Sequence, residues 1–426
     1  MGRYKIAFTI AALAAVGWLY GCVTARLPNV PLQVAGDAAS PAALGAFLAD
    51  APVTSAEDWS GRRAPLLREA FQTNIYGRFP DAVAVSVTDR AALDASLFHG
   101  AAVMEQWTVR LGAPEDDRGF GLLLVLPAHA QGPVPVIIMQ NFCGNAAVYP
   151  DIPGIAGPRA AGPQECGSGL MRPVIGLIFG DAIMTPPTLE ILNAGYGLAM
   201  MYGGDIAPDD GEAALAALNA LSPAGASPDQ RTGAIAAWAW GYLRAMEAIS
   251  ADPRVRADQI VLWGHSRNGK AALLAAAFDA RPAAVIALQS GTAGASLGRD
   301  QVGESIAQIT ATYPHWFSPA YAAFAGREAE LPVDQHQLLA LIAPRPVLLA
   351  GARRDQWSDP IGAVRAAQGA SGVYELLGAA PFQQEDLRNG AYDRPLATYM
   401  RGGLHGVHGG DWDQAIAFLD ARLRGR

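Results

Sequence analysis

The feature that most restricts the fold is an alternation of short apolar runs with helical segments in the second half of the chain. Four runs have the length and composition of buried parallel strands: Leu198–Tyr202, Ile260–Trp263, Ala284–Gln289 and Val347–Ala350. Four segments have a helical pattern: Gly233–Ser250, Arg267–Phe278, Asp334–Leu341 and Trp412–Leu423. Strands that alternate with helices predict a doubly wound, mostly parallel sheet in a three-layer αβα sandwich.

Four earlier apolar runs predict further strands, the first of them in an antiparallel N-terminal part of the sheet. They cover Val83–Thr88, Ala102–Arg110, Gly121–Leu126 and Val134–Gln140. The chain has no apparent internal repeat. We therefore expect residues 51–426 to form a single α/β domain, with its extra length in loop insertions.

The N-terminus has the pattern of an export signal. Arg3 and Lys5 precede an apolar run of 14 residues, Ile6–Leu19. This length suits the core of a signal peptide, because a membrane-spanning helix needs roughly 18 apolar residues or more. We predict a signal peptide over residues 1–21, a tether over 22–50 and export to the periplasm.

Two kinds of processing are open. Leu19-Tyr20-Gly21-Cys22 resembles a lipobox, which predicts a lipid anchor at Cys22 in the outer membrane, although Tyr20 is bulky for its position. Val23-Thr24-Ala25 offers ordinary signal peptidase a site instead. A lipid anchor at Cys22 is the one membrane contact that we expect.

Composition excludes several classes of protein. The chain has 31 basic and 39 acidic residues, a net charge of −8 and no basic run, which argues against nucleic-acid binding. With 51% hydrophobic residues it is also unlike a disordered protein. Cys143 and Cys166 could pair in an oxidising compartment or stay separate. No paired Cys/His spacing is present, so we expect no metal and no cofactor, in a monomeric protein.

The most informative segment is Val261–Lys270, in which a hydrophobic strand enters Gly-x-Ser-x-x-Gly and continues as a helix. This order predicts a nucleophile elbow, with Ser266 exposed on a sharp turn. The second glycine usually stands two residues after the serine, where this chain has Asn268 and places Gly269 one residue later. We predict that Ser266 is the catalytic nucleophile of an α/β hydrolase.

Two cations follow Ser266 on the predicted helix. The backbone N–H of Arg267 can donate to a developing oxyanion at the helix N-terminus. Lys270 lies one helical turn from Ser266, which predicts a substrate contact. Lys5 and Lys270 are the only lysines in the chain, so Lys270 would be the single lysine of the mature protein. An interchangeable surface cation would here be arginine.

Chain order narrows the choice of base and acid, because α/β hydrolases have the order serine, acid, histidine. His405 lies in a glycine-rich loop before the final helix and is our choice of base, with His408 as the alternative. Asp355 follows the Val347–Ala350 strand and is the preferred acid. Asp359 is the alternative acid, although it precedes Pro360 and could cap the next helix instead.

From Trp59 to Trp412 the chain resembles the glucuronoyl esterase family of carbohydrate esterases. The similar stretches are Ser266–Lys270, Gly303–Ser305, His315–Phe317, Leu331–His336, Ala343–Pro346 and Gly203–Pro208. The resemblance implies that Arg267 supports the oxyanion and that Lys270 hydrogen-bonds hydroxyl groups of a uronic acid. It also implies that Glu304 and Trp357 contact the sugar and that His405 is the base.

Two residues depart from the family pattern. Many members have a catalytic glutamate where this chain has Gln289, and an amide cannot serve as the charged partner of a histidine. Some bacterial relatives use an acid after the penultimate strand instead, which is where Asp355 stands. The second departure is His265, where many members have cysteine.

The resulting hypothesis is a serine esterase that hydrolyses the C6 ester of glucuronic or 4-O-methyl-glucuronic acid, as in the ester links between lignin and glucuronoxylan. Ser266, His405 and Asp355 would form the triad and an acyl-enzyme the intermediate. One alternative is an acetyl-xylan or general carboxylesterase. Another is a non-catalytic carbohydrate-binding surface lipoprotein, which Gln289 makes conceivable.

Overall fold

The computed structural model describes residues 53–113, 116–159, 172–383 and 392–424. The predicted signal peptide, the tether and Cys22 lie outside the described residues, so export and lipidation stay predictions. Cys143 is disulfide-bonded, and Cys166 lies outside the described residues. None of the helices in the described ranges combines the length and the hydrophobicity needed to cross a bilayer.

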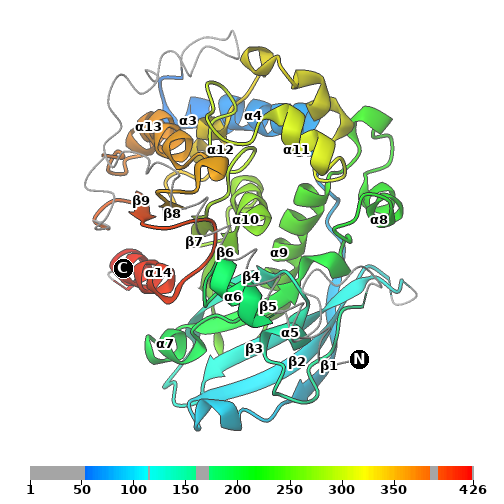
Figure 1. The fold of residues 1–426 in the computed structure, drawn as a ribbon, viewed down its shortest axis with the longest axis vertical. Coiled ribbons are helices and arrows are strands. Elements are labelled where there is room, and N and C mark those ends of the chain that lie inside the picture. The colour runs from blue at the N-terminus through cyan, green and yellow to red at the C-terminus, as the bar shows by residue number, and fades with distance from the viewer. Residues whose placement is uncertain (1–52, 114–115, 160–171, 384–391, 425–426) are drawn as a thin grey trace, which may run out of the picture.

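A single nine-stranded sheet runs through the described part of the chain, in the order β1-β2-β3-β5-β4-β6-β7-β8-β9 (Figure 1). Its strands are β1 (Val85–Ala92), β2 (Ala102–Leu111), β3 (Gly119–Pro127), β4 (Val134–Asn141), β5 (Gly197–Tyr202), β6 (Val255–His265), β7 (Ala284–Leu288), β8 (Val347–Ala352) and β9 (Leu396–Arg401). The pairs β1–β2, β2–β3 and β3–β5 are antiparallel, and all later pairs are parallel. The mostly parallel sheet with an antiparallel N-terminal part is therefore confirmed.

The edge strands differ most from the sequence prediction. β9 was not predicted, because Leu396–Arg401 mixes buried and half-buried positions and lacks a continuous apolar run. β1 begins two residues later than predicted, and most of its residues are exposed. Edge strands face water on one side, so their hydrophobic pattern is weaker than that of central strands.

The α-helices of the described residues are α3 (Ala56–Asp58), α4 (Ala64–Phe71), α5 (Asn145–Val148), α6 (Arg172–Phe179), α7 (Thr188–Asn193), α8 (Ala213–Leu221), α9 (Ala234–Ser250), α10 (Arg267–Phe278), α11 (Ile306–Thr312), α12 (Gln335–Ala340), α13 (Pro360–Leu376) and α14 (Gly409–Leu423). Figure 1 shows α7 and α14 on one side of the sheet, away from α9, α10, α12 and α13. The four helices predicted from sequence correspond to α9, α10, α12 and α14.

Two hydrophobic cores lie on the two faces of the sheet, because successive side chains of a strand point in opposite directions. On β4, Val136 and Ile138 belong to the core that α9 and α10 cover, whereas Ile137 and Met139 belong to the core that α14 covers. This division is the three-layer αβα arrangement expected from sequence. The carboxyl ends of β4, β6, β7 and β8 meet at one edge, where ligands bind in α/β sheets.

Two buried side chains, Tyr242 of α9 and Gln140 of β4, join helix α9 to the centre of the sheet. The hydroxyl of Tyr242 donates to the carbonyl oxygen of Trp263 on β6 at 2.7 Å. It also accepts from the backbone N–H of Gln140 on β4 at 3.2 Å. The side-chain amide of Gln140 donates to the carbonyl oxygen of Trp238 at 2.7 Å. These bonds set the position of β4 relative to β6 near their carboxyl ends.

We expect Tyr242→Phe to lower the free energy of unfolding by about 1–3 kcal/mol, because it removes two buried hydrogen bonds to backbone groups. The measurement is urea unfolding followed by tryptophan fluorescence. Tyr392→Phe is the control, since among the described residues the hydroxyl of Tyr392 is bonded only to the side chain of Gln414, which is partly accessible to water. Equal losses in the two variants would contradict the assignment.

Candidate active site

Ser266 lies on the turn between β6 and α10, with φ 55° and ψ −126°. A residue other than glycine rarely adopts this conformation, and the strain is typical of a nucleophile elbow. A Cβ atom at Gly264 would collide with the carbonyl of Asn268, so glycine is required there. Asn268 donates from its side chain to the carbonyl oxygen of Gln140 at 3.0 Å, which joins the elbow to β4.

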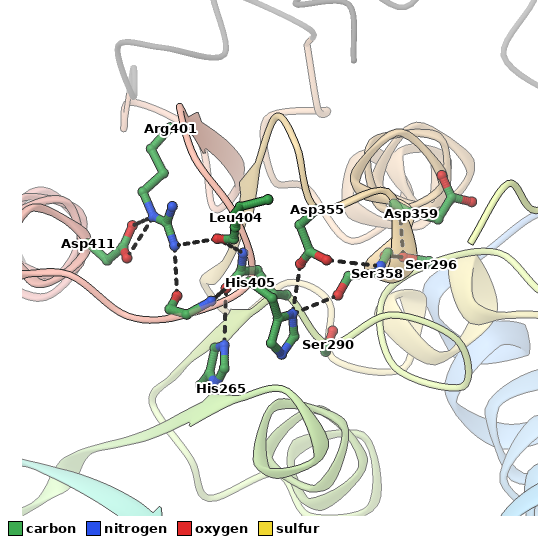
Figure 2. A network of polar contacts seen from close by, with 12 residues as sticks. His265, Ser290, Ser296, Asp355, Ser358, Asp359, Arg401, Leu404, His405 and Asp411 are labelled. Carbon is green, nitrogen blue, oxygen red and sulfur yellow. Dashed lines mark hydrogen bonds and ion pairs between the residues drawn. The ribbon is translucent and has the colours of Figure 1, made fainter. Parts of the chain in front are cut away.

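His405 and Asp355 are in direct contact (Figure 2). The Nδ1 atom of His405 is 2.8 Å from Oδ2 of Asp355 and 3.1 Å from Oγ of Ser358. Asp355 is buried, and its Oδ1 accepts from the backbone N–H of Ser358 at 3.3 Å. An Nδ1–H that donates to Asp355 leaves Nε2 of His405 free to accept a proton.

The imidazole of His405 lies beside the elbow. Its ring centroid is 4.6 Å from that of His265, the residue that precedes Ser266. Ser266 is half-buried, so part of the residue is accessible to solvent. The structure thus gathers all three members of the proposed triad at the carboxyl edge of the sheet.

The alternative acid and base have other partners. Asp359 caps α13, because its Oδ1 accepts from the backbone N–H of Gly362 at 2.9 Å. His408 is half-exposed, with its Nδ1 3.3 Å from Oδ1 of Asp181. Of the candidate bases and the candidate acids, the structure therefore brings His405 and Asp355 into contact.

Arg267 is held by an acid that sequence reasoning missed. Its Nη1 is 2.8 Å from Oδ2 of Asp209. Oδ1 of Asp209 accepts from Nε2 of His315 at 2.7 Å and from the indole N–H of Trp316 at 2.6 Å. Burial acts to raise the pKa of Asp209, but its hydrogen bonds and the charge of Arg267 lower it to about 2. The guanidinium also lies 4.9 Å from the ring centroid of Phe142.

A weak signal for Asp209 was present in the sequence. It directly follows Gly203–Pro208, one of the stretches that resemble the esterase family. Nothing local links it to Arg267, because 58 positions separate the two residues. Ser358 was missed for a simpler reason, since it stands between the two aspartates weighed as the acid.

Lys270 is fully buried and points at the segment after β7. Its Nζ donates to the carbonyl oxygens of Ser290 and Thr292, each at 2.6 Å. Burial lowers the pKa of Lys270 to about 8, against the charges of Glu304 and Asp355, which favour the ammonium. Two of the three N–H groups of the ammonium thus donate to backbone carbonyl oxygens.

Glu304 and Trp357 lie next to each other. The backbone N–H of Glu304 donates to the carbonyl oxygen of Trp357 at 3.0 Å. Burial raises the pKa of Glu304, while the charges of Lys270 and His405 oppose that rise. The Trp357 side chain is 53% exposed. The pair therefore combines a buried carboxyl group with an aromatic face open to a ligand.

Within the described residues, no cluster of three or more acidic, histidine or cysteine side chains is arranged to hold a metal ion. Catalysis without a metal stays a prediction. The residues assembled at the elbow are those of acyl-transfer chemistry: a strained serine, an imidazole with a carboxylate behind it, and a fixed guanidinium.

Comparison with known proteins points to one family. A family model described as fungal glucuronyl esterase matches residues 227–378. The chain is 34% identical over 381 residues to the carbohydrate esterase MZ0003 from an unknown prokaryotic organism. This match covers 88% of the chain and 87% of the relative.

Two solved structures are similar over nearly the whole chain. A glucuronoyl esterase from Solibacter usitatus has a TM-score of 0.76 and 32% identity, and the match covers 94% of this chain and 100% of that one. A promiscuous CE15 esterase from a marine bacterial metagenome has a TM-score of 0.76 and 31% identity, with 94% and 99% covered.

Lys270 makes stability depend on pH. Its pKa is about 8 in the folded protein and 10.5 ordinarily, so between these values the unfolded chain binds a proton that the folded protein has released. The free energy of unfolding therefore rises with pH in this window. From about pH 7 to pH 10, we expect the free energy of unfolding of the wild type to rise by roughly 2 kcal/mol relative to that of Lys270→Met.

Urea unfolding at several pH values measures this difference. Leu273→Met, a buried change on the same helix that adds no titrating group, is the control and should run parallel to the wild type. Parallel profiles for the wild type and Lys270→Met would show that Lys270 keeps an ordinary pKa in the folded protein.

Proposed function

Because this chain belongs to the glucuronoyl esterase family of carbohydrate esterases and is a carboxylic ester hydrolase, we propose that it cleaves the C6 ester of glucuronic or 4-O-methyl-glucuronic acid. The ester links between lignin and glucuronoxylan are the proposed natural target. The observation that carries the mechanism is the contact of 2.8 Å between His405 and Asp355 beside the strained turn of Ser266.

In the first step, the oxygen of Ser266 attacks the ester carbonyl while Nε2 of His405 takes the serine proton. The carboxylate of Asp355 holds the imidazole in the required tautomer and stabilises the imidazolium. When the tetrahedral intermediate collapses, His405 passes the proton to the leaving alcohol and the C6 acyl group stays on Ser266. Water activated by His405 then adds to the acyl-enzyme, and its collapse releases the uronic acid and restores the serine.

Two donors from Arg267 would stabilise the oxyanion of each tetrahedral intermediate. Its backbone N–H opens α10, and its guanidinium is held in place by Asp209 at 2.8 Å. A fixed donor of this kind contributes about 3–4 kcal/mol to the transition state. Because Asp209 and the ring of Phe142 already restrict the guanidinium, little reorganisation is needed during the reaction.

We propose that Lys270, Glu304 and Trp357 bind the sugar. The remaining N–H of Lys270 and the carboxyl group of Glu304 suit the hydroxyl groups of a uronic acid. The exposed indole of Trp357 suits the apolar face of the ring. The product is a carboxylate, so the positive charge of Arg267 matches the acid that the reaction forms.

A second candidate is a general or acetyl-xylan carboxylesterase. It is favoured by one observation, that a structural relative with 31% identity is described as promiscuous. The non-catalytic lipoprotein suggested by Gln289 is set aside, because the chain is a carboxylic ester hydrolase by family.

The substrate is tested with wild type and Ser266→Ala on benzyl and methyl esters of glucuronic and galacturonic acid, beside 4-nitrophenyl acetate. We expect the wild type to prefer a glucuronate ester by at least about tenfold in kcat/KM, and Ser266→Ala to lose roughly 10⁴-fold or more in kcat. Faster cleavage of the acetate would favour the general esterase. Turnover that survives in Ser266→Ala would remove Ser266 from the mechanism.

The acid is tested by a pair of matched substitutions. We expect Asp355→Asn to lower kcat by roughly 10³–10⁴-fold, because an amide stabilises neither the tautomer nor the imidazolium of His405. Asp359→Asn keeps an N-capping side chain and should leave kcat within about threefold. Steady-state kinetics on the preferred ester measures both variants, and the reverse ranking would transfer the role to Asp359.

A further inference from the structure

Gln289 follows β7 directly and sends its side chain to the loop that carries His405. It is buried and has φ 48°, a left-handed conformation rare for a residue other than glycine. Its Nε2 donates to the carbonyl oxygen of Leu404 at 3.1 Å. Its Oε1 accepts from the backbone N–H of Gly406 at 2.9 Å. One amide thus bonds the peptide groups on both sides of His405.

His265 sets the orientation of this amide. Its Nε2 is 3.0 Å from Oε1 of Gln289, so it must carry the proton and donate. Its Nδ1 is buried and has no hydrogen-bond partner among the described residues, so no acceptor stabilises a second proton there. Burial holds the pKa of His265 well below its ordinary value. Neutral His265 therefore keeps the oxygen of Gln289 toward Gly406 and its nitrogen toward Leu404.

Arg401 holds the same loop from another side. Its Nη2 donates to the carbonyl oxygens of Leu404 at 3.0 Å and Gly406 at 2.7 Å. Its Nε is bonded to Asp411 at 2.9 Å (Figure 2). The Leu404 carbonyl thus accepts from both Arg401 and Gln289. The Gly406 N–H is bonded by Gln289.

We propose that Gln289 is a positioning residue of the reaction: with His265 it forms a neutral brace that holds the His405 loop, while Asp355 carries the charge. This inference rests on the proposed function. Gln289 contacts the peptide groups on both sides of His405 and therefore affects the reaction through the position of that base. Together with Asp355 and Ser358 at Nδ1, the brace fixes both the position and the tautomer of the imidazole.

The chemistry of the site explains why an amide suits this position. A carboxylate can accept from Gly406 and His265, but it cannot donate to Leu404, and it would face that carbonyl oxygen with a negative charge. A carboxylate would also add a second acid near His405. The charge of His405 already acts on Glu304 and His265. Glutamine satisfies all three partners without that charge.

Three variants separate the brace from a merely structural role. We expect Gln289→Met to lower kcat by about 10–100-fold with KM within about twofold, and to leave the acid limb of the pH profile of kcat/KM in place. Gln289→Glu keeps the shape but adds charge, so the acid limb should move to higher pH. His265→Phe keeps a ring and removes the donor, and its effect should not add to that of Gln289→Met.

Gln259→Ala is the matched control. Gln259 is also a buried glutamine whose Nε2 donates to a backbone carbonyl, that of Leu423 at 3.3 Å, but it lies in the earlier half of β6. Gln259→Ala should lower the midpoint temperature of thermal unfolding and leave kcat unchanged. All variants are assayed on whichever ester the wild type turns over, so a failed uronate preference would not be confused with a failed brace.

Two outcomes would overturn the inference. One is wild-type kcat in Gln289→Met; the other is a loss of kcat that Gln259→Ala reproduces at an equal thermal midpoint. If Gln289→Met does not fold, Gln289→Glu and His265→Phe decide. The brace is contradicted if both Gln289→Glu and His265→Phe keep full kcat and the acid limb of the pH profile stays in place in Gln289→Glu.

Discussion

The strained turn at Ser266 is the constraint on which the rest of the site depends. A serine in this conformation costs of the order of 1–3 kcal/mol, and the surrounding structure must supply that energy. The turn is anchored at both ends, since α10 and the half of β6 next to the turn are buried, and Asn268 bonds it to Gln140 on β4. Tyr242 in turn bonds Gln140 and Trp263. The elbow is thus the end point of a hydrogen-bond network that begins in α9.

Charges at the site are few and paired. Only 16% of the residues are charged, yet Arg267 meets Asp209, Arg401 meets Asp411, and Lys270 lies within the electrostatic reach of Glu304. An unpaired charge in such surroundings would be costly, whereas a paired and hydrogen-bonded one can be held at a defined place. The neutral amide of Gln289 fits the same pattern, because it connects strand β7 to the His405 loop without another charge to balance.

The parts predicted from the sequence are those with a local signal. Central strands were predicted because burial on both faces gives continuous apolar runs, and edge strand β9 was missed because it has none. Ser266 was predicted from a strand, a turn and a helix in order. His405 and Asp355 were chosen by chain order, with His408 and Asp359 left open. Asp209 was not identified, because its partner Arg267 comes from another strand end and no spacing connects them.

The sequence by itself determined the fold class, the position of the elbow and the short list of acids and bases, because each depends on the order of elements and on residues close in the chain. Only the tertiary structure decided which aspartate faces His405, that Arg267 is held by Asp209, and that Lys270 points at backbone carbonyls after β7. These are contacts between the carboxyl ends of different strands and their loops. Their geometry depends on how the loops pack, which local propensity and spacing do not specify.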